Sequence, residues 1–361
     1  MAYLYLKESD LRRYCEAVFR AYGFSEAEAA GISDVILTAD LYGIESHGVQ
    51  RLHRYADALD DGFADPKATI ETVFETPSSA VLDADRTMGQ VAARYAMELA
   101  IRKAKETGFG AVTVRRSNHF GIAGYWSSMA AAEDLLGISM TSTEAIAIPT
   151  NGKKAILGTS PIAVCMPADP VPFWFDAATT VVTRGKLEVY QKLGKPLPEG
   201  WAADADGKSC RDAGTVIRNI CNKAGGGIFP LGGESELTGS HKGYGLGVLV
   251  ELLTSVFSGG TLSPHVVRSG NADTNFTVMA LDYGMFGDKA RIREQMSQML
   301  RELRESPLAD GCERIYTHGE KELESRERLL ATGIPVQERT LAELKLIAER
   351  LSIDPSAYLP V

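Results

Sequence analysis

Apolar residues in the first third of the chain recur with the spacing of amphipathic helices. Between residues 9 and 23 they lie on one face of a predicted helix that ends at Gly23. These apolar positions are Leu11, Tyr14, Val18 and Phe19. Ser25 followed by Glu28 is a capping-box pattern, which predicts that a second helix begins there. With a third predicted helix over residues 46–55, we expect the N-terminal region to be largely helical.

Further along the chain, short runs of β-branched and aromatic residues predict strands. These runs are residues 80–83, 111–114, 136–140, 161–164, 173–175 and 276–281. The predicted helices are residues 90–106, a buried helix over 243–257, residues 288–304, and a last helix beginning at Thr340 with Glu343 completing a capping box. Strand-like runs dominate from Gly110 to Asp176 without regularly spaced helices, so a doubly wound parallel sheet is not expected.

Composition and net charge indicate which classes of binding partner are disfavoured. The 361 residues are 45% hydrophobic and 24% charged, which is typical of a globular protein with two or three domains. The net charge of −9 disfavours a nucleic acid or an anionic membrane, because both attract basic surfaces. No apolar run reaches the roughly 18 residues of a transmembrane helix, so no membrane partner is expected.

The spacing of the cysteines and of potential metal ligands bears on the redox compartment and on metal binding. The five cysteines are scattered and form no C-x-x-C pair, which indicates reduced thiols in a cytoplasmic protein. The sequence contains no H-E-x-x-H motif and no carboxylate cluster of the kind that binds metals. A metal site is therefore not expected.

The segment from Ser46 to Tyr55 carries the most informative chemistry. His47 and Arg51 are four residues apart, which places them on one face of the predicted helix. An arginine binds a carboxylate through two parallel hydrogen bonds, and a histidine exchanges a proton near neutral pH. Together they are the minimum needed to interconvert a 2-hydroxy acid and a 2-keto acid. The alternative is a surface helix with ordinary charges.

That reaction needs a hydride carrier, yet the G-x-G-x-x-G motif of dinucleotide-binding folds is absent. The nearest match, Gly243–Gly247, has its third glycine one residue early and does not follow a predicted strand. Just before it, His241 and Lys242 occupy a predicted helix N-terminus, which suits a phosphate or simply a solvated pair of charges. Other candidate functional loops are residues 116–121 and 157–161, which combine polar residues with glycine, and residues 176–180, which combine polar residues with alanine.

Taken together, these segments resemble the malate/L-lactate dehydrogenase family that lacks a Rossmann fold. The matching segments follow the family order along nearly the whole chain. They are residues 46–48 with Arg51 and Tyr55, 117–121, 158–163, 176–180, 184–186, 198–201, 230–233, 241–246, 319–320 and 333–335. Family members include malate, L-sulfolactate and ureidoglycolate dehydrogenases, 2,3-diketogulonate reductase and cyclic imino-acid reductases.

The resemblance implies an α/β (α+β) fold in which a mixed, largely antiparallel sheet binds NAD or NADP. A helical domain would be built from both chain ends, residues 1–76 and 307–361, and the sheet domain would span residues 77–306. The resemblance also implies a homodimer with the cofactor site near the subunit interface. No Rossmann motif supplies an acidic residue that would distinguish the two cofactors, so NAD and NADP stay open, with NAD favoured.

The resemblance also implies roles for individual residues. His47 is expected to donate the proton to the carbonyl during reduction with support from Ser46, and His119 is the second candidate for the acid–base residue. The expected substrate contacts are Arg51, Tyr55 and Thr159. The expected cofactor contacts are His119, Phe120, Gly121, Thr143, Asp176, Ala177, Ala178, Thr179, Lys186, His241, Lys242, Gly319 and Glu320.

These features predict an NAD(P)-dependent dehydrogenase that acts on the CH–OH group of a small 2-hydroxy carboxylate. Lys186 stands where an imino-acid reductase relative carries an aspartate of a Ser–His relay, which favours keto-acid over imine chemistry. Ureidoglycolate dehydrogenation and cyclic imino-acid reduction on the same scaffold are the alternatives. A non-redox protein that binds a small anion is a more remote one.

Overall fold

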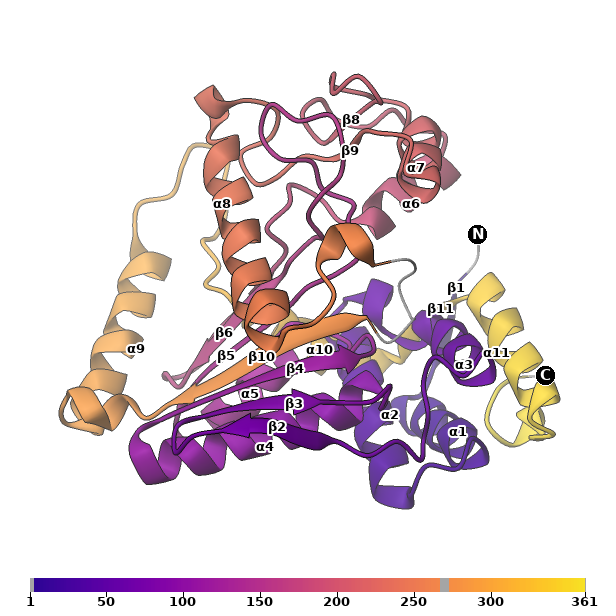
Figure 1. The fold of residues 1–361 in the computed structure, drawn as a ribbon, viewed down its shortest axis with the longest axis horizontal. Coiled ribbons are helices and arrows are strands. Elements are labelled where there is room, and N and C mark those ends of the chain that lie inside the picture. Colours follow the sequence, from indigo (N-terminus) through magenta and orange to yellow (C-terminus); the bar gives the residue numbers. More distant parts are fainter. Residues whose placement is uncertain (1–2, 267–272, 361) are drawn as a thin grey trace.

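A seven-stranded sheet forms the centre of the computed structural model, which describes residues 3–266 and 273–360 (Figure 1). The strands follow the order β2-β3-β4-β10-β5-β6-β7. Their bounds are β2 Glu71–Glu75, β3 Ser79–Asp83, β4 Phe109–Ser117, β5 Leu136–Thr141, β6 Ile162–Met166, β7 Phe173–Ala177 and β10 Thr274–Leu281. Neighbouring strands are antiparallel except β3 and β4, which are parallel. The predicted mixed, largely antiparallel sheet is confirmed.

Helices cover both faces of this sheet and build the rest of the molecule. Their bounds are α1 Glu8–Ala21, α2 Glu26–Leu41, α3 Leu52–Asp60, α4 Gly89–Thr107, α5 Ala123–Ala132, α6 Arg184–Lys192, α7 Ala213–Asn222, α8 Ser240–Glu251, α9 Lys289–Glu305, α10 Glu320–Thr332 and α11 Glu338–Arg350. Within the described residues, no helix has both the length and the apolar character needed to cross a lipid bilayer.

Alternate residues of the central strands face opposite layers, as the two-residue period of a strand requires. On one face, Val112 of β4 and Phe276 of β10 are fully buried in a core shared with α4 and α5. On the other face, the Thr277 hydroxyl donates a hydrogen bond to the carbonyl of Leu253, in a π-helical turn that continues α8. The sheet is therefore buried on both sides along its middle strands.

Both ends of the chain build a second core, which is mainly helical. Helices α1, α2, α3 and α11 share it, and β1 (Tyr3–Leu6) pairs antiparallel with β11 (Ile334–Gln337). The Tyr14 hydroxyl donates to the carbonyl of Leu344 at 2.5 Å, joining α1 directly to α11. Strand β2 lies in the central sheet through its pairing with β3. The proposed boundaries of two domains, after residues 76 and 306, remain a prediction.

A smaller core lies beside the central sheet. It is formed around α6 and α7 with the short strands β8 (Ala202–Ala203) and β9 (Gly227–Ile228), and buries Leu187 and Val216. Figure 1 shows this lobe at the top of the molecule. Arg184, Glu188 and Cys221 of this lobe line the cavity described below.

Two predictions about helices are wrong in detail. The region from Gly110 to Asp176 contains α5, which the strand-rich pattern missed because its buried residues, such as Trp126, leave no long alternation of polar and apolar faces. The last helix begins at Glu338 instead of Thr340, and its N-cap Gln337 makes no side-chain capping hydrogen bond. Thr340 is buried in the first turn, so the predicted capping box does not form.

The predicted buried helix over 243–257 is also corrected. The helix begins at Ser240, continues as a π-helical turn at Leu252–Val256, and leaves a row of apolar side chains at least 40% exposed. These residues, which we call the α8 face, are Leu246, Val248, Leu249, Leu252, Val256 and Phe257. An apolar composition alone cannot distinguish burial within one chain from burial against another chain.

We expect the C-terminal helix to be essential to the helical core. Leu344 on α11 is 1% exposed, so Leu344→Ala should lower the free energy of unfolding by about 2–5 kcal/mol through the cavity it leaves. Leu346 on the same helix is 62% exposed, and Leu346→Ala should change stability by less than about 0.5 kcal/mol. Equal denaturation midpoints for the two variants would contradict this packing.

Candidate active site

A cavity of about 790 Å³ lies where the helical core, the sheet and the smaller lobe meet. Its volume falls within the range of about 300–1,000 Å³ that is usual for sites of small molecules and cofactors. Six of the predicted site residues line it, namely Ser46, His47, Arg51, His119, Thr143 and Thr159. Residues from segments more than 100 positions apart in the chain are therefore brought to one site.

His47 and Arg51 do not lie on one continuous helix, which corrects the prediction. His47 ends a 3₁₀ turn (Glu45–His47), Gly48 is extended, and Arg51 ends a second 3₁₀ turn (Val49–Arg51) just before α3. Both side chains still line the cavity. The Arg51 Nε donates to the carbonyl of Ser46, which joins the two turns.

Asp40 explains why the backbone is extended at Gly48. A Cβ atom on Gly48 would lie 1.8 Å from the Asp40 Oδ1, so only glycine fits here. The other carboxyl oxygen of Asp40 accepts the backbone N–H of Val49 at 2.8 Å. Burial raises the pKa of Asp40 to about 8, with a smaller contribution of the same sign from Glu45. Asp40 therefore holds the turn that carries His47 and is largely protonated at neutral pH.

His119 enters the cavity from the sheet side, directly after β4. Its Nδ1 lies 2.7 Å from the Tyr55 hydroxyl and accepts the backbone N–H of Gly121 at 3.3 Å. Because a backbone N–H can only donate, Nδ1 must be the unprotonated nitrogen, and the neutral ring carries its hydrogen on Nε2. Burial lowers the pKa of His119, as do His47 and the nearby arginines, so this tautomer is neutral.

The two imidazole rings are stacked, with their centroids 5.4 Å apart. The Nδ1 of His47 lies 2.9 Å from the Ser46 hydroxyl, and no described residue is hydrogen-bonded to its Nε2. Burial lowers the pKa of His47 to about 4, with further contributions from Arg51 and Arg54. The site therefore holds two neutral histidines beside permanently charged guanidinium groups.

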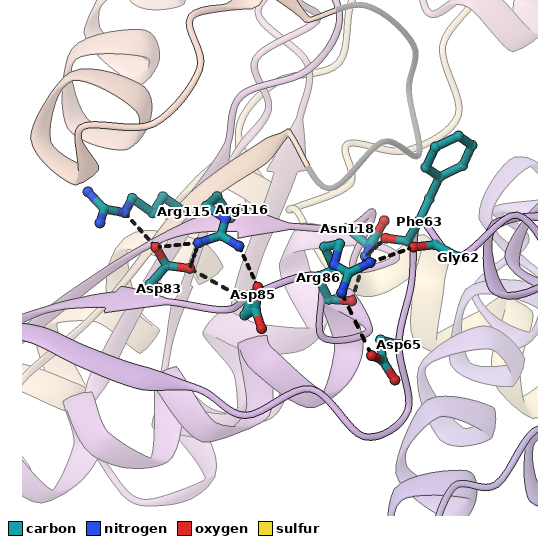
Figure 2. A network of polar contacts seen from close by, with 9 residues as sticks. All are labelled: Gly62, Phe63, Asp65, Asp83, Asp85, Arg86, Arg115, Arg116 and Asn118. Carbon is teal, nitrogen blue, oxygen red and sulfur yellow. Dashed lines mark hydrogen bonds and ion pairs between the residues drawn. The ribbon is translucent and has the colours of Figure 1, made fainter.

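A polar network behind the cavity fixes the segment before His119 (Figure 2). The side-chain amide of Asn118 donates to the carbonyls of Phe63 and Arg86, each at 3.1 Å. The same view shows Arg86 reaching the carbonyl of Gly62, and it shows Asp83 bound by Arg115 at the end of β4. Asn118 thereby joins the loop after α3 to the loop before α4, and the backbone of the next residue carries His119.

Two of the residues that line the cavity, Thr143 and Thr159, belong to loops that are joined by a hydrogen bond. Thr143 accepts the backbone N–H of Thr159 at 3.0 Å, and a Cβ atom on Gly158 would lie 2.1 Å from the Thr143 Oγ1. Thr179 donates its hydroxyl and its N–H to the carbonyl of Thr159. The hydroxyl of Ser160 is buried without a hydrogen-bond partner among the described residues. Thr143 and Thr159 line the cavity, whereas Gly158, Ser160 and Thr179 do not. A wall of hydroxyl and backbone groups at these two residues suits an amide-bearing ring.

Other predicted cofactor contacts lie outside this cavity, and their roles remain predictions. Asp176 on β7 accepts the N–H of Gly124 at 2.7 Å at the N-terminus of α5, and burial raises its pKa to about 6. Ala177 and Ala178 follow it on the same segment and are partly exposed. Phe120 is buried against Trp126 and Phe276 in the sheet core.

The remaining predicted cofactor contacts are one glycine and three residues at the protein surface. Gly121 has a positive φ of 88°, and a Cβ atom there would lie 2.4 Å from Val35. Lys186 on α6 is exposed, as are His241 and Lys242 at the first turn of α8. None of these four side chains or backbones lines the cavity described above.

A second cavity, of about 370 Å³, contains Gly319 together with Trp174 and Glu322. Glu320 next to Gly319 is buried and accepts the N–H of Thr317 and a hydrogen bond from Arg314. The predicted Gly319–Glu320 contact therefore lies at a separate hollow, which Trp174 of β7 also lines.

Sequence reasoning missed three groups that shape the site. Arg54 and Arg184 line the cavity beside Arg51, and Asp40 supports the His47 turn from below. The sequence offered a weak signal for Arg54 alone, because it lies three residues after Arg51 near the same helical face. Arg184 lies in the segment 184–186 that matches the family, but no role for its side chain was predicted, and nothing local to Asp40 indicated one.

Comparisons with known proteins agree with this geometry. The sequence profile of the family described as malate/L-lactate dehydrogenase matches residues 6–345. The chain belongs to this family. It is therefore an oxidoreductase that acts on 2-hydroxy acids with a nicotinamide cofactor, as the sequence predicted.

Two relatives and two solved structures illustrate the similarity. A malate dehydrogenase of Pyrococcus abyssi is 42% identical over 353 residues, 97% of this chain and 96% of the relative. An L-sulfolactate dehydrogenase of Methanocaldococcus jannaschii is 36% identical over 360 residues, 98% of this chain and 99% of the relative. A malate dehydrogenase structure from Entamoeba histolytica has a TM-score of 0.93 at 33% identity, covering 98% of this chain and 99% of that chain. One from Pyrococcus horikoshii has a TM-score of 0.90 at 38% identity, covering 98% and 97%.

We expect the buried Asp40 carboxyl to make stability depend on pH. Its folded pKa of about 8 lies above the unfolded value of about 4, so its protonated form stabilises the fold at low pH. That contribution is lost as the pH rises towards 8. Asp40→Asn keeps an acceptor for Val49 and cannot ionise. The stability of this variant relative to the parent should therefore improve by about 1 kcal/mol or more between pH 5 and pH 8.5.

Urea denaturation of both proteins at the two pH values measures that difference, since all other titrating groups are shared and cancel. A difference that does not change with pH would contradict the assignment of a raised pKa to Asp40.

Proposed function

We propose that this dehydrogenase uses His47 as its acid–base residue, Arg51 as its carboxylate clamp and His119 as a neutral hydrogen-bond donor. The observation that carries the proposal is the stacking of His47 on His119, at 5.4 Å between centroids, in a cavity that Arg51 also lines. A bound nicotinamide would supply or accept the hydride at C2 of the substrate. The protein's own groups orient the substrate and move the proton.

Arg51 suits the carboxylate that all 2-hydroxy acids share. Its Nε is held by the Ser46 carbonyl, which fixes the guanidinium next to His47 and leaves its remaining N–H groups for a ligand. A fixed fork orients the carboxylate and therefore the adjacent carbon that carries the oxygen. Thr159 on the opposite wall, and Tyr55 through its contact with His119, complete the proposed substrate contacts.

The proposed roles of the two histidines differ because their hydrogen bonds differ. His119 is fixed as the tautomer with hydrogen on Nε2, and protonating its Nδ1 would set that proton against the Gly121 N–H. His47 has a serine hydroxyl at Nδ1, which can accept or donate and so tolerates both protonation states. We infer that His47 transfers the proton and that His119 donates a hydrogen bond to the oxygen as it gains charge.

Substrate charge would set the protonation state of His47. In the free protein its pKa is about 4, so the neutral ring is ready to act as a base in oxidation. An anionic substrate on Arg51 would screen one of the positive charges that depress this pKa. The pKa would rise, and His47 could carry the proton required for reduction.

We propose NAD in preference to NADP as the cofactor. The hollow at Gly319, which the family resemblance places in the cofactor shell, is lined by Glu322 and Asp134. Its one arginine, Arg293, is bound to Asp169 at 2.9 Å. A 2′-phosphate brings about two negative charges and prefers unpaired cations, so these surroundings favour the hydroxyl of NAD.

We also propose a homodimer that pairs the α8 face. An exposed row of apolar side chains on one helix usually marks a protein–protein contact. Most soluble oligomers are symmetric dimers in which one patch meets its own copy. We place the protein in the cytoplasm, because its five cysteines are all free thiols and two of them, Cys15 and Cys165, are buried.

The roles of the histidines are tested by pH profiles of variants. His47→Asn should lower kcat about 10²- to 10⁴-fold, and it should remove the proton dependence of kcat/KM for keto-acid reduction. In the parent protein that kcat/KM should fall about tenfold per pH unit above pH 5, because the protonated fraction of His47 falls by that factor.

His119→Gln keeps an N–H donor, so it should lower the rate yet retain the pH slope. Loss of the slope in His119→Gln, with retention in His47→Asn, would reverse the assignment. Absence of NADH oxidation with oxaloacetate, pyruvate, sulfopyruvate, 2,3-diketogulonate and a cyclic imino acid would reject the dehydrogenase proposal itself.

The dimer is tested by charge placed on the α8 face. Leu249→Glu should convert the protein to monomers in sedimentation-velocity experiments, because a buried unpaired carboxylate opposes association. Leu346→Glu adds the same charge to an exposed position on α11 and should leave the assembly unchanged. A Leu249→Glu variant with the parent's sedimentation coefficient would exclude this face as the contact.

A further inference from the structure

Arg54 is a charged group of the cavity that the proposed mechanism does not use. It lies on α3, three residues after Arg51, and its side chain lines the cavity together with His47 and Arg51. It makes no hydrogen bond and no ion pair with any residue in 3–266 or 273–360. The neighbouring Arg184 differs, because its Nε donates to Glu188 at 3.1 Å.

The surroundings of Arg54 are unfavourable for an uncompensated cation. Burial and the nearby charge of Arg51 lower the pKa of Arg54, while Glu144 acts in the opposite direction from a distance beyond ion-pair contact. Desolvating a guanidinium without a hydrogen-bonded anion costs free energy. Two adjacent guanidinium groups on one wall therefore create a strong local preference for negative charge.

The carboxylates of the cavity do not supply that charge. Asp57 is bound to Arg350 at 3.2 Å, and Glu188 is bound to Arg184. Glu144 and Asp61, which also line the cavity, form no ion pair within the described residues. No described carboxylate is in ion-pair contact with Arg54, which leaves its charge available to a ligand. The shared carboxylate of 2-hydroxy acids already has Arg51 as its partner under the proposed function.

We propose that Arg54 is a specificity-determining residue that selects substrates with a second anionic group. Resting on the proposed function, the inference is that Arg51 holds the carboxylate at C1 while Arg54 binds an anion on the carbon beyond C2. A C4 dicarboxylate and the corresponding sulfonate both provide this charge at a similar distance. A monoanionic keto acid such as pyruvate leaves Arg54 without a partner, so it binds less well.

The test compares three keto acids with the parent enzyme and with Arg54→Gln, at saturating NADH. The parent should prefer oxaloacetate to pyruvate by at least about a hundredfold in kcat/KM. Arg54→Gln should lower kcat/KM for oxaloacetate by about a hundredfold and change that for pyruvate by less than about threefold. Sulfopyruvate shows which anion Arg54 prefers, because the larger loss identifies the better-held group.

Two further variants separate a specific contact from a general charge effect. Arg54→Lys keeps the charge without the planar fork and should recover part of the lost activity, about tenfold. Arg184→Gln removes a cation that is already paired on the same cavity and should leave the ratio of oxaloacetate to pyruvate activity within about threefold.

Several outcomes would overturn the inference. Equal losses of kcat/KM for all three keto acids in Arg54→Gln would show that Arg54 does not discriminate among them. An unchanged ratio of oxaloacetate to pyruvate activity would show the same. A raised KM for NADH with unchanged keto-acid preference would assign Arg54 to the cofactor. Failure of the proposed function is distinct, because the parent enzyme would then reduce none of the three.

Discussion

Clustered, partly buried positive charge is the constraint on which this active site depends. Arg51 and Arg54 lie on one wall of the cavity, and their charges, added to burial, hold His47 neutral with a pKa of about 4. Such an arrangement is unfavourable when empty and becomes favourable when an anion enters. Substrate recognition and proton transfer are therefore coupled, because the same charges that attract the acid determine whether His47 is protonated.

The fold places these charges by joining parts that are distant in the sequence. His47 and Arg51 belong to the helical core, which needs α11 from the far end of the chain, whereas His119 follows strand β4 of the central sheet. The stacking of the two imidazoles therefore requires the helical core and the sheet core to keep a fixed position relative to each other. Asn118 contributes directly, because it bonds backbone carbonyls of Phe63 and Arg86 on the two loops that connect these cores (Figure 2).

Much of this could be predicted from the sequence, and the failures have physical causes. Periodicity located most helices and strands, and the ordered motifs indicated the family and the convergence of His47, Arg51 and Thr159. The break at Gly48 was invisible because its cause is a tertiary contact, the buried Asp40 carboxyl. Helix α5 lacks a polar face because sheet and helices bury it, so its pattern did not resemble an amphipathic helix.

The ion-pair partners of charged residues could not be predicted from the sequence either. Whether Arg54 is paired depends on which carboxylates reach it, and Asp57 and Glu188 are bound by Arg350 and Arg184 instead. The exposure of the α8 face likewise depends on what the rest of one chain can cover, which composition does not reveal.

The coupling of substrate charge to His47 is tested most directly by measuring proton uptake on binding. Oxaloacetate would be titrated calorimetrically into the complex with 1,4,5,6-tetrahydro-NAD, a non-reactive reduced cofactor, at pH 7 in buffers of different ionisation enthalpy. We predict uptake of about one proton per site in the parent protein and none in His47→Asn. Binding without proton uptake, or equal uptake in both proteins, would contradict the account.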